Sequence, residues 1–163
     1  MDVWGVKRGL AALILLLVRT HPAGFRVLLG EYPEPDGLEI HNMLRALDED
    51  ADPEMRVDGG GRTLPEAVRV VESAERFEAI VRQAGGWGHI RRVTGEWAQN
   101  YEATWRMVVD HAKWVCGGFS RLDSSQLDRV ARMHGVSRDT VWRRVREFPA
   151  ALAAAILAEP GEE

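Results

Sequence analysis

Several residue types are scarce in this chain of 163 residues, and each scarcity excludes a class of protein. The single cysteine, Cys116, cannot form an internal disulfide, which excludes a disulfide-stabilised secreted domain and suits the reducing cytoplasm. Lysine occurs only at Lys7 and Lys113, against nineteen arginines. This preference for arginine is typical of a GC-rich bacterium or its phage, so we expect a cytoplasmic protein of that origin.

The chain also lacks the residue patterns that hold metals, bind nucleotides or form catalytic centres. Its five histidines are scattered, and no two have the i, i+4 spacing of a helical zinc site. The glycine triplet Gly59–Gly61 is not followed by the Gly-Lys-Ser/Thr of a phosphate-binding loop. We therefore predict no metal, no cofactor and no enzymatic activity.

Long hydrophobic runs are absent as well, since the longest one, Leu10–Val18, has nine residues. As a helix this run would rise about 13.5 Å, much less than the roughly 30 Å core of a bilayer. The basic residues before it give the outline of a signal peptide, but Arg19 ends the run and no small-x-small cleavage site follows. The sequence favours a buried helix from Val6 to Arg19, enclosed by its own domain or by a partner subunit, and no membrane contact. A signal peptide is the alternative.

Prolines and glycines are frequent between residues 22 and 37. Within this stretch Phe25–Leu29 could form a short strand or a helical turn. A helix with one apolar face is expected over Leu38–Leu47. Residues 48–62 are acidic and glycine-rich, which is typical of a flexible connector. We therefore predict an N-terminal helical region at residues 1–47 and a connector at residues 48–62.

Residues 63–163 have helical periodicity and are predicted to form a helical core. One helix is expected to begin with Thr63 as its cap and to end before the glycine pair Gly85-Gly86. A second helix is expected from Thr94 to Cys116. The predicted fold class is all-α, a helical bundle with a helix-turn-helix near its C-terminus.

Four tryptophans lie between residues 87 and 114, at Trp87, Trp97, Trp105 and Trp114. Aromatic residues can stack on the bases of single-stranded nucleic acid when they lie on a basic surface. Here acidic residues share the same segment, and large side chains at helical spacing are usually buried. We therefore expect these tryptophans to form the hydrophobic core.

Residues 123–147 have the pattern of two short helices joined by a tight turn. Asp123 can cap the first helix, and Gln126 completes a capping-box pattern. Gly135 lies where the turn requires a positive φ, and Ser137 can cap the second helix. The residues expected to pack the two helices together are Leu127, Val130, Ala131, Val136, Val141 and Val145.

The dipeptide Phe148-Pro149 follows this pattern, and its proline is expected to break the second helix. Ala150–Ala158 would then form a separate short helix, because its residues have high helix propensity. The apolar side chains of that helix require it to dock either on the core or on a second copy of the chain.

The outward residues of the second helix are mostly arginines. Residues 121–146 contain seven arginines and three aspartates, a net of +4, in a chain whose net charge is −4. A basic patch on an acidic protein suits a polyanion, and guanidinium groups suit guanine and phosphate. The residues predicted to bind DNA are Arg121, Arg132, Ser137, Arg138, Asp139, Thr140, Trp142, Arg143, Arg144 and Arg146.

This segment resembles a known DNA-binding motif through Ala131, Gly135-Val136-Ser137-Arg138 and Val141. The pattern is similar to the helix-turn-helix of bacterial sigma-factor region 4, of the C-terminal domain of DNA invertases and resolvases, and of many phage regulators. The resemblance covers about 25 of the 163 residues. The chain departs from it at Arg144, where many members have an apolar residue.

The resemblance implies roles for particular residues. In that superfamily the residues directly after the Gly-Val-Ser turn read bases. It therefore assigns base reading to Arg138, Asp139, Trp142 and Arg143, and it places Ser137 near a phosphate.

These patterns together predict a bacterial or phage protein that binds double-stranded DNA. The first interpretation is a sequence-specific transcription regulator, acting as a homodimer or beside a second DNA- or polymerase-bound partner, because one such helix reads only a few base pairs. The second is an adaptor, similar to phage antiterminators, that binds DNA and RNA polymerase. The third is a phage packaging or recombination accessory protein, and the fourth is a purely structural or protein-binding hairpin.

Overall fold

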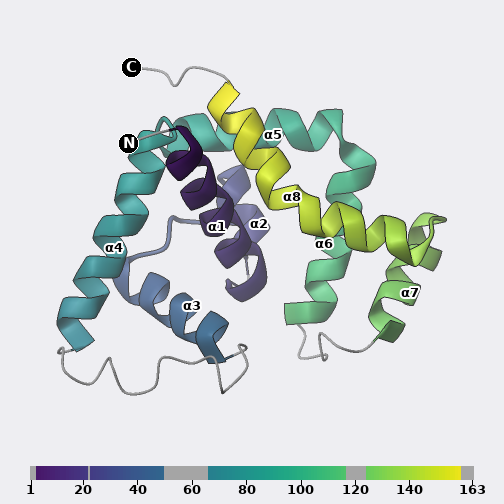
Figure 1. Cartoon of the computed structure of the whole chain (residues 1–163), viewed down its shortest axis with the longest axis horizontal. Helices are drawn as coiled ribbons and strands as arrows, with labels where there is room; N and C mark the ends of the chain where they lie inside the picture. Colours follow the sequence, from purple (N-terminus) through teal and green to yellow (C-terminus); the bar gives the residue numbers. More distant parts are fainter. Residues whose placement is uncertain (1–2, 22, 50–65, 117–123, 159–163) are drawn as a thin grey trace.

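The computed structural model describes residues 3–21, 23–49, 66–116 and 124–158 (Figure 1). These residues form eight helices and no strand, so the predicted all-α fold is confirmed. The helices are α1 (Val3–Thr20), α2 (Gly24–Leu29), α3 (Gly37–Glu49), α4 (Glu66–Gln83), α5 (Trp87–Asn100), α6 (Glu102–Cys116), α7 (Ser124–His134) and α8 (Arg138–Ala158). Residues 50–65 of the chain, which include most of the predicted connector and Thr63, lie outside the described residues.

The apolar helix α1 is enclosed by the other helices of the chain. It packs against α2, α3, α4, α6 and α8, and Leu10, Ile14 and Leu17 are completely buried. The prediction of a buried helix inside its own domain is therefore confirmed. No helix in the described part of the chain is both long and apolar enough to span a bilayer.

One hydrophobic core joins both ends of the sequence, because α1 and α8 lie side by side within it. Phe148 on α8 is its aromatic centre, with ring centroids 5.4 Å from Trp97, 5.9 Å from Trp105 and 6.1 Å from Phe25. The predicted core role is confirmed for Trp97 and Trp105, and Trp87 also packs against the core. The side chain of Trp114 lies outside the described part of the structure.

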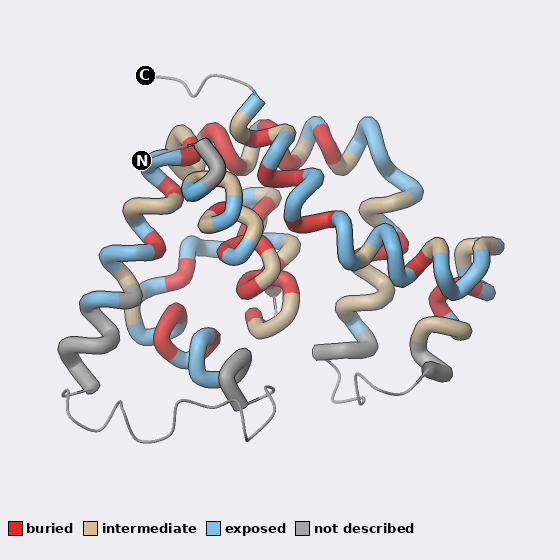
Figure 2. The backbone as a smooth tube through the Cα atoms, in the orientation of Figure 1, coloured by how far each residue is buried: buried red, intermediate tan, exposed pale blue. Residues whose placement is uncertain are grey.

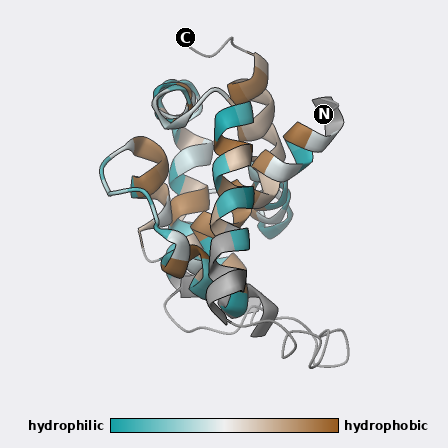
Figure 3. Ribbon diagram, turned by 90° about the vertical axis from the view of Figure 1, so that its left-hand side faces the viewer, coloured by the Kyte–Doolittle hydropathy of each residue, from teal (hydrophilic) through white to brown (hydrophobic). Residues whose placement is uncertain are grey.

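The outer helices have one face toward this core and one toward solvent. In Figure 2 buried and exposed residues alternate along α8, and in Figure 3, which faces the α4 side, hydrophilic and hydrophobic stretches alternate along α4. Phe77 and Val81 are the buried residues that attach α4 to the core. The segment Phe25–Leu29, for which a strand was the alternative, is helical.

The helix predicted from Thr94 to Cys116 is wrong in both its start and its continuity. Helix α5 begins at Trp87, directly after Gly86 with φ 91°, and Tyr101 separates it from α6. At Tyr101 (φ −123°, ψ 49°) the chain turns, so α5 and α6 run in different directions (Figure 1). The apolar spacing conceals this break because Trp97 and Trp105, on either side of it, pack into the same core.

The predicted helix break at Phe148-Pro149 is also wrong, because α8 continues through Pro149 to Ala158. Proline removes one N–H and crowds the carbonyl four residues earlier, which either kinks a helix or breaks it; here buried residues on both sides of Pro149 hold the helix together. Figure 1 shows α8 changing direction part-way along its length. Leu152, Ala153 and Ile156 beyond the proline are buried, so this half of α8 docks on the core of its own chain, which was one of the two docking sites expected for it.

His111 on α6 is expected to make the stability of the protein depend on pH. Burial and the nearby positive charge of Arg19 lower the pKa of His111 from its usual 6.5, because both disfavour the imidazolium. The unfolded chain therefore binds the proton more readily, and stability that is complete above about pH 6.5 is lost as the pH falls toward the folded-state pKa. Urea unfolding at pH 7.5 and pH 5.5 should show a larger loss of stability for the wild type than for His111→Asn. Equal losses would exclude His111 as the source.

Candidate nucleic-acid interface

Helices α7 and α8 are joined by a tight turn at Gly135. Gly135 has a φ of 66°, as the sequence predicted for this position. The N–H of Val136 donates to the carbonyl of Ala131 at 3.0 Å, and the N–H of Gly135 donates to that of Arg132 at 3.4 Å. This pair of bonds is a Schellman motif, which satisfies the last carbonyls of α7 and fixes the direction in which the chain leaves the helix.

Ser137 caps α8, as predicted. Its Oγ accepts the backbone N–H of Thr140 at 3.2 Å, and its carbonyl accepts the N–H of Val141 at 3.2 Å. The first turn of α8 therefore starts at a defined residue. The structure does not describe the side chains of Asp123 and Gln126, which were the predicted cap of α7.

A small hydrophobic cluster holds the two helices together. Its buried members are Val130 and Ala131 from α7, Val141 from α8 and Met107 from α6, and the partly buried Leu127, Val136 and Val145 pack against it. The predicted inner residues are therefore confirmed. The sequence did not single out Met107, because it lies outside the apolar spacing of Trp105, Val108 and Ala112 that predicted this helix.

Two polar contacts fix this pair of helices to α6. Nη1 of Arg144 donates to Oγ1 of Thr104, and Nε2 of His134 lies 2.7 Å from Oδ2 of Asp110. Arg144 thus lies toward α6, in keeping with its position beside the inner residue Val145. The orientation of the start of α8 relative to the core is set by these contacts and by the hydrophobic cluster.

The outward side of α8 carries the other predicted residues. We call Arg138, Asp139, Trp142, Arg143 and Arg146 the arginine face; all five are exposed. Trp142 is 50% exposed, whereas the neighbouring Val141 is completely buried. Within the described part of the chain Arg143 and Arg146 form no ion pair.

Arg138 and Arg132 are both held by one residue of α7. Nε of Arg138 lies 3.5 Å from Oδ1 of Asp128, and Nε of Arg132 donates to the main-chain carbonyl of Asp128 at 3.4 Å. Thr140 is half-buried beside Ser137, and Arg121 lies outside the described residues. The structure therefore brings nine of the ten predicted residues onto α7, the turn and the first half of α8.

An open depression of about 690 Å³ lies between α7 and the start of α8. Its lining is Asp128, Ala131, Arg132, Val136, Ser137, Arg138 and Asp139. Its two apolar lining residues, Ala131 and Val136, belong to or pack against the small cluster, and the other five are polar or charged.

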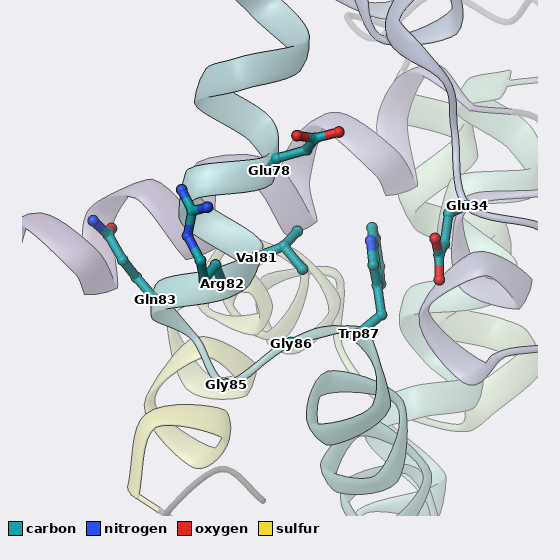
Figure 4. A pocket seen from close by; sticks show the side chains of 8 residues that line it. All are labelled: Glu34, Glu78, Val81, Arg82, Gln83, Gly85, Gly86 and Trp87. Atoms are coloured by element: carbon teal, nitrogen blue, oxygen red, sulfur yellow. The ribbon is translucent and has the colours of Figure 1, made fainter. Parts of the chain in front are cut away.

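A second open depression, of about 610 Å³, lies at the turn between α4 and α5 (Figure 4). Its lining includes Glu34, Glu78, Arg82 and Trp87. The Trp87 ring already packs against Phe77 at 5.9 Å and against the guanidinium of Arg91 at 5.5 Å. The Trp87 ring that lines this depression is thus already engaged in contacts within the fold. The charged residues around it, Glu34, Glu78 and Arg82, are of both signs.

The described residues contain no group of three or more histidine, cysteine, aspartate or glutamate side chains that could hold a metal ion. No family model matches the chain, and neither a curated protein nor a solved structure is detectably similar to it. The geometry of α7 and α8 is therefore the basis for the functional proposal.

Proposed function

We propose that this protein binds double-stranded DNA through the arginine face of α8 and acts as a sequence-specific transcription regulator of bacterial or phage type. One observation carries the proposal. The first half of α8 is anchored by buried residues on one side and presents Trp142, Arg143 and Arg146, exposed and without ion pairs among the described residues, on the other. A rigid helix with free guanidinium groups suits the major groove, where Arg binds guanine O6 and N7.

The distribution of charge supports this orientation. Residues 127–147 contain six arginines and three acidic residues, whereas the whole chain has a net charge of −4. DNA would be attracted to this end of the molecule, where α7 lies far from α3 and α4 (Figure 1), and repelled by the acidic remainder. Release of counterions from the phosphates would supply most of the sequence-independent affinity.

One helix reads only a few base pairs, so sequence-specific binding requires a second reading unit. A homodimer on a palindromic site fits the simple regulator. A single copy that co-purifies with RNA polymerase would fit the adaptor instead. Selection of bound duplexes from a random pool, followed by sedimentation of the complex, tests both the site and the stoichiometry. The absence of any salt-dependent binding to duplex DNA would exclude the proposal.

Arg143→Ala should weaken binding to the selected duplex by about 1–3 kcal/mol, the scale of one bidentate contact with a base. Fluorescence anisotropy of a labelled duplex measures this loss. Arg76→Ala, which removes an exposed arginine from α4, is the matched control and should leave the affinity unchanged. An equal loss on every duplex would assign Arg143 to phosphate, and an equal effect of Arg76→Ala would show that the arginine face is not the DNA-binding surface.

A further inference from the structure

The depression between α7 and α8 has balanced charges rather than an excess of positive ones. Two of its lining residues are arginines, Arg132 and Arg138, and two are aspartates, Asp128 and Asp139. A surface that served only to attract phosphates would bind DNA more tightly without the two carboxylates, because each one repels the phosphate charge. The carboxylates therefore call for a separate explanation.

Asp128 is the carboxylate that contacts an arginine of the arginine face. It binds Arg138 through Nε at 3.5 Å, which leaves the terminal Nη1 and Nη2 groups as donors for another partner. The two side chains are 46% and 49% exposed, so the ion pair contributes little to the stability of the fold and stays accessible to DNA. Arg138 is thus oriented by Asp128 without being buried by it.

We infer that Asp128 is a positioning residue that makes Arg138 favour a guanine edge over a phosphate; this inference rests on the proposed function. Guanine offers two neutral acceptors that match the two Nη groups while Nε stays on Asp128. A phosphate is an anion, so it competes with Asp128 for the same guanidinium and is repelled by the carboxylate. Asp128 therefore lowers the affinity for DNA in general more than the affinity for the correct site.

The test compares Asp128→Asn with Glu75→Gln, which makes the same change of charge at an exposed position on α4. The probes are the selected duplex and a random-sequence duplex of equal length, each titrated over a range of salt. For Asp128→Asn, affinity for the random duplex should rise about 3–10-fold, and the slope of log K against log salt should steepen by about one phosphate contact. Affinity for the selected duplex should change less, so the specificity ratio falls. Glu75→Gln should change neither affinity.

The double variant Asp128→Asn/Arg138→Ala separates positioning from simple charge repulsion. If Asp128 acts through Arg138, the change in salt slope caused by Asp128→Asn disappears when Arg138 is alanine. The inference is overturned if the slope change persists in that background, if both duplexes gain equally, or if the wild type binds DNA without any sequence preference. The first two results leave the proposed function intact, whereas a wild type without sequence preference removes its sequence-specific part and one that binds neither duplex removes it altogether.

Discussion

Phe148→Ala should lower the free energy of unfolding by about 3–5 kcal/mol, the usual cost of deleting a buried aromatic side chain. Phe148 is 2% exposed and contacts rings from three other helices, namely Phe25 on α2, Trp97 on α5 and Trp105 on α6. These rings belong to different helices, so they cannot fill the cavity unless those helices shift toward it. Urea unfolding followed by circular dichroism measures the loss, and Phe148→Leu should lose less because it leaves a smaller cavity.

Trp142→Ala is the matched control for this prediction, since it removes a larger aromatic side chain from the same helix. Trp142 is half exposed, and surface substitutions of this kind usually change stability by no more than about 0.5 kcal/mol. Under the proposed function, Trp142→Ala should instead reduce DNA binding. Similar losses of stability for Phe148→Ala and Trp142→Ala would show that the aromatic centre of the core has been misassigned.

The helices of this protein were predictable where local spacing alone decides them. The apolar run of α1, the glycine turn at Gly135 and the cap at Ser137 each depend on residues within one or two turns of sequence. The break at Tyr101 and the passage of α8 through Pro149 were not predictable in the same way. Both are decided by packing around Phe148, whose ring partners are far away in the sequence.

The same distinction applies to the candidate interface. The i, i+3, i+4 spacing separated the inner residues Val130 and Val141 from the outer residues Trp142 and Arg143 correctly. It could not show that Arg144 bonds to Thr104, forty residues earlier in the chain. Nor did it show that Asp128 would engage Arg138, because that contact depends on how closely the turn brings α7 to the start of α8.

Gly24→Ala should destabilise the fold by about 3 kcal/mol, at the upper end of the usual cost of overpacking a protein interior. Gly24 is the first residue of α2 and is buried. A Cβ at this position would lie 2.0 Å from the carbonyl oxygen of Leu17 and 3.0 Å from the backbone nitrogen of Val18. These atoms belong to the backbone of α1, which is packed on several sides, so α2 would have to move away from the centre of the core.

Gly95→Ala should have the opposite effect on stability when it is measured by the same urea unfolding. Gly95 lies inside α5, and an added Cβ there would meet nothing within 4 Å. The alanine should therefore stabilise the protein by about 0.5–1 kcal/mol, because it restricts the unfolded chain and favours the helix. Opposite shifts of the urea midpoint for the two variants would establish that the contact of Gly24 with α1, and not helix propensity, is what requires glycine there. If Gly24→Ala also raised the midpoint, the close approach of α2 to α1 would be wrong.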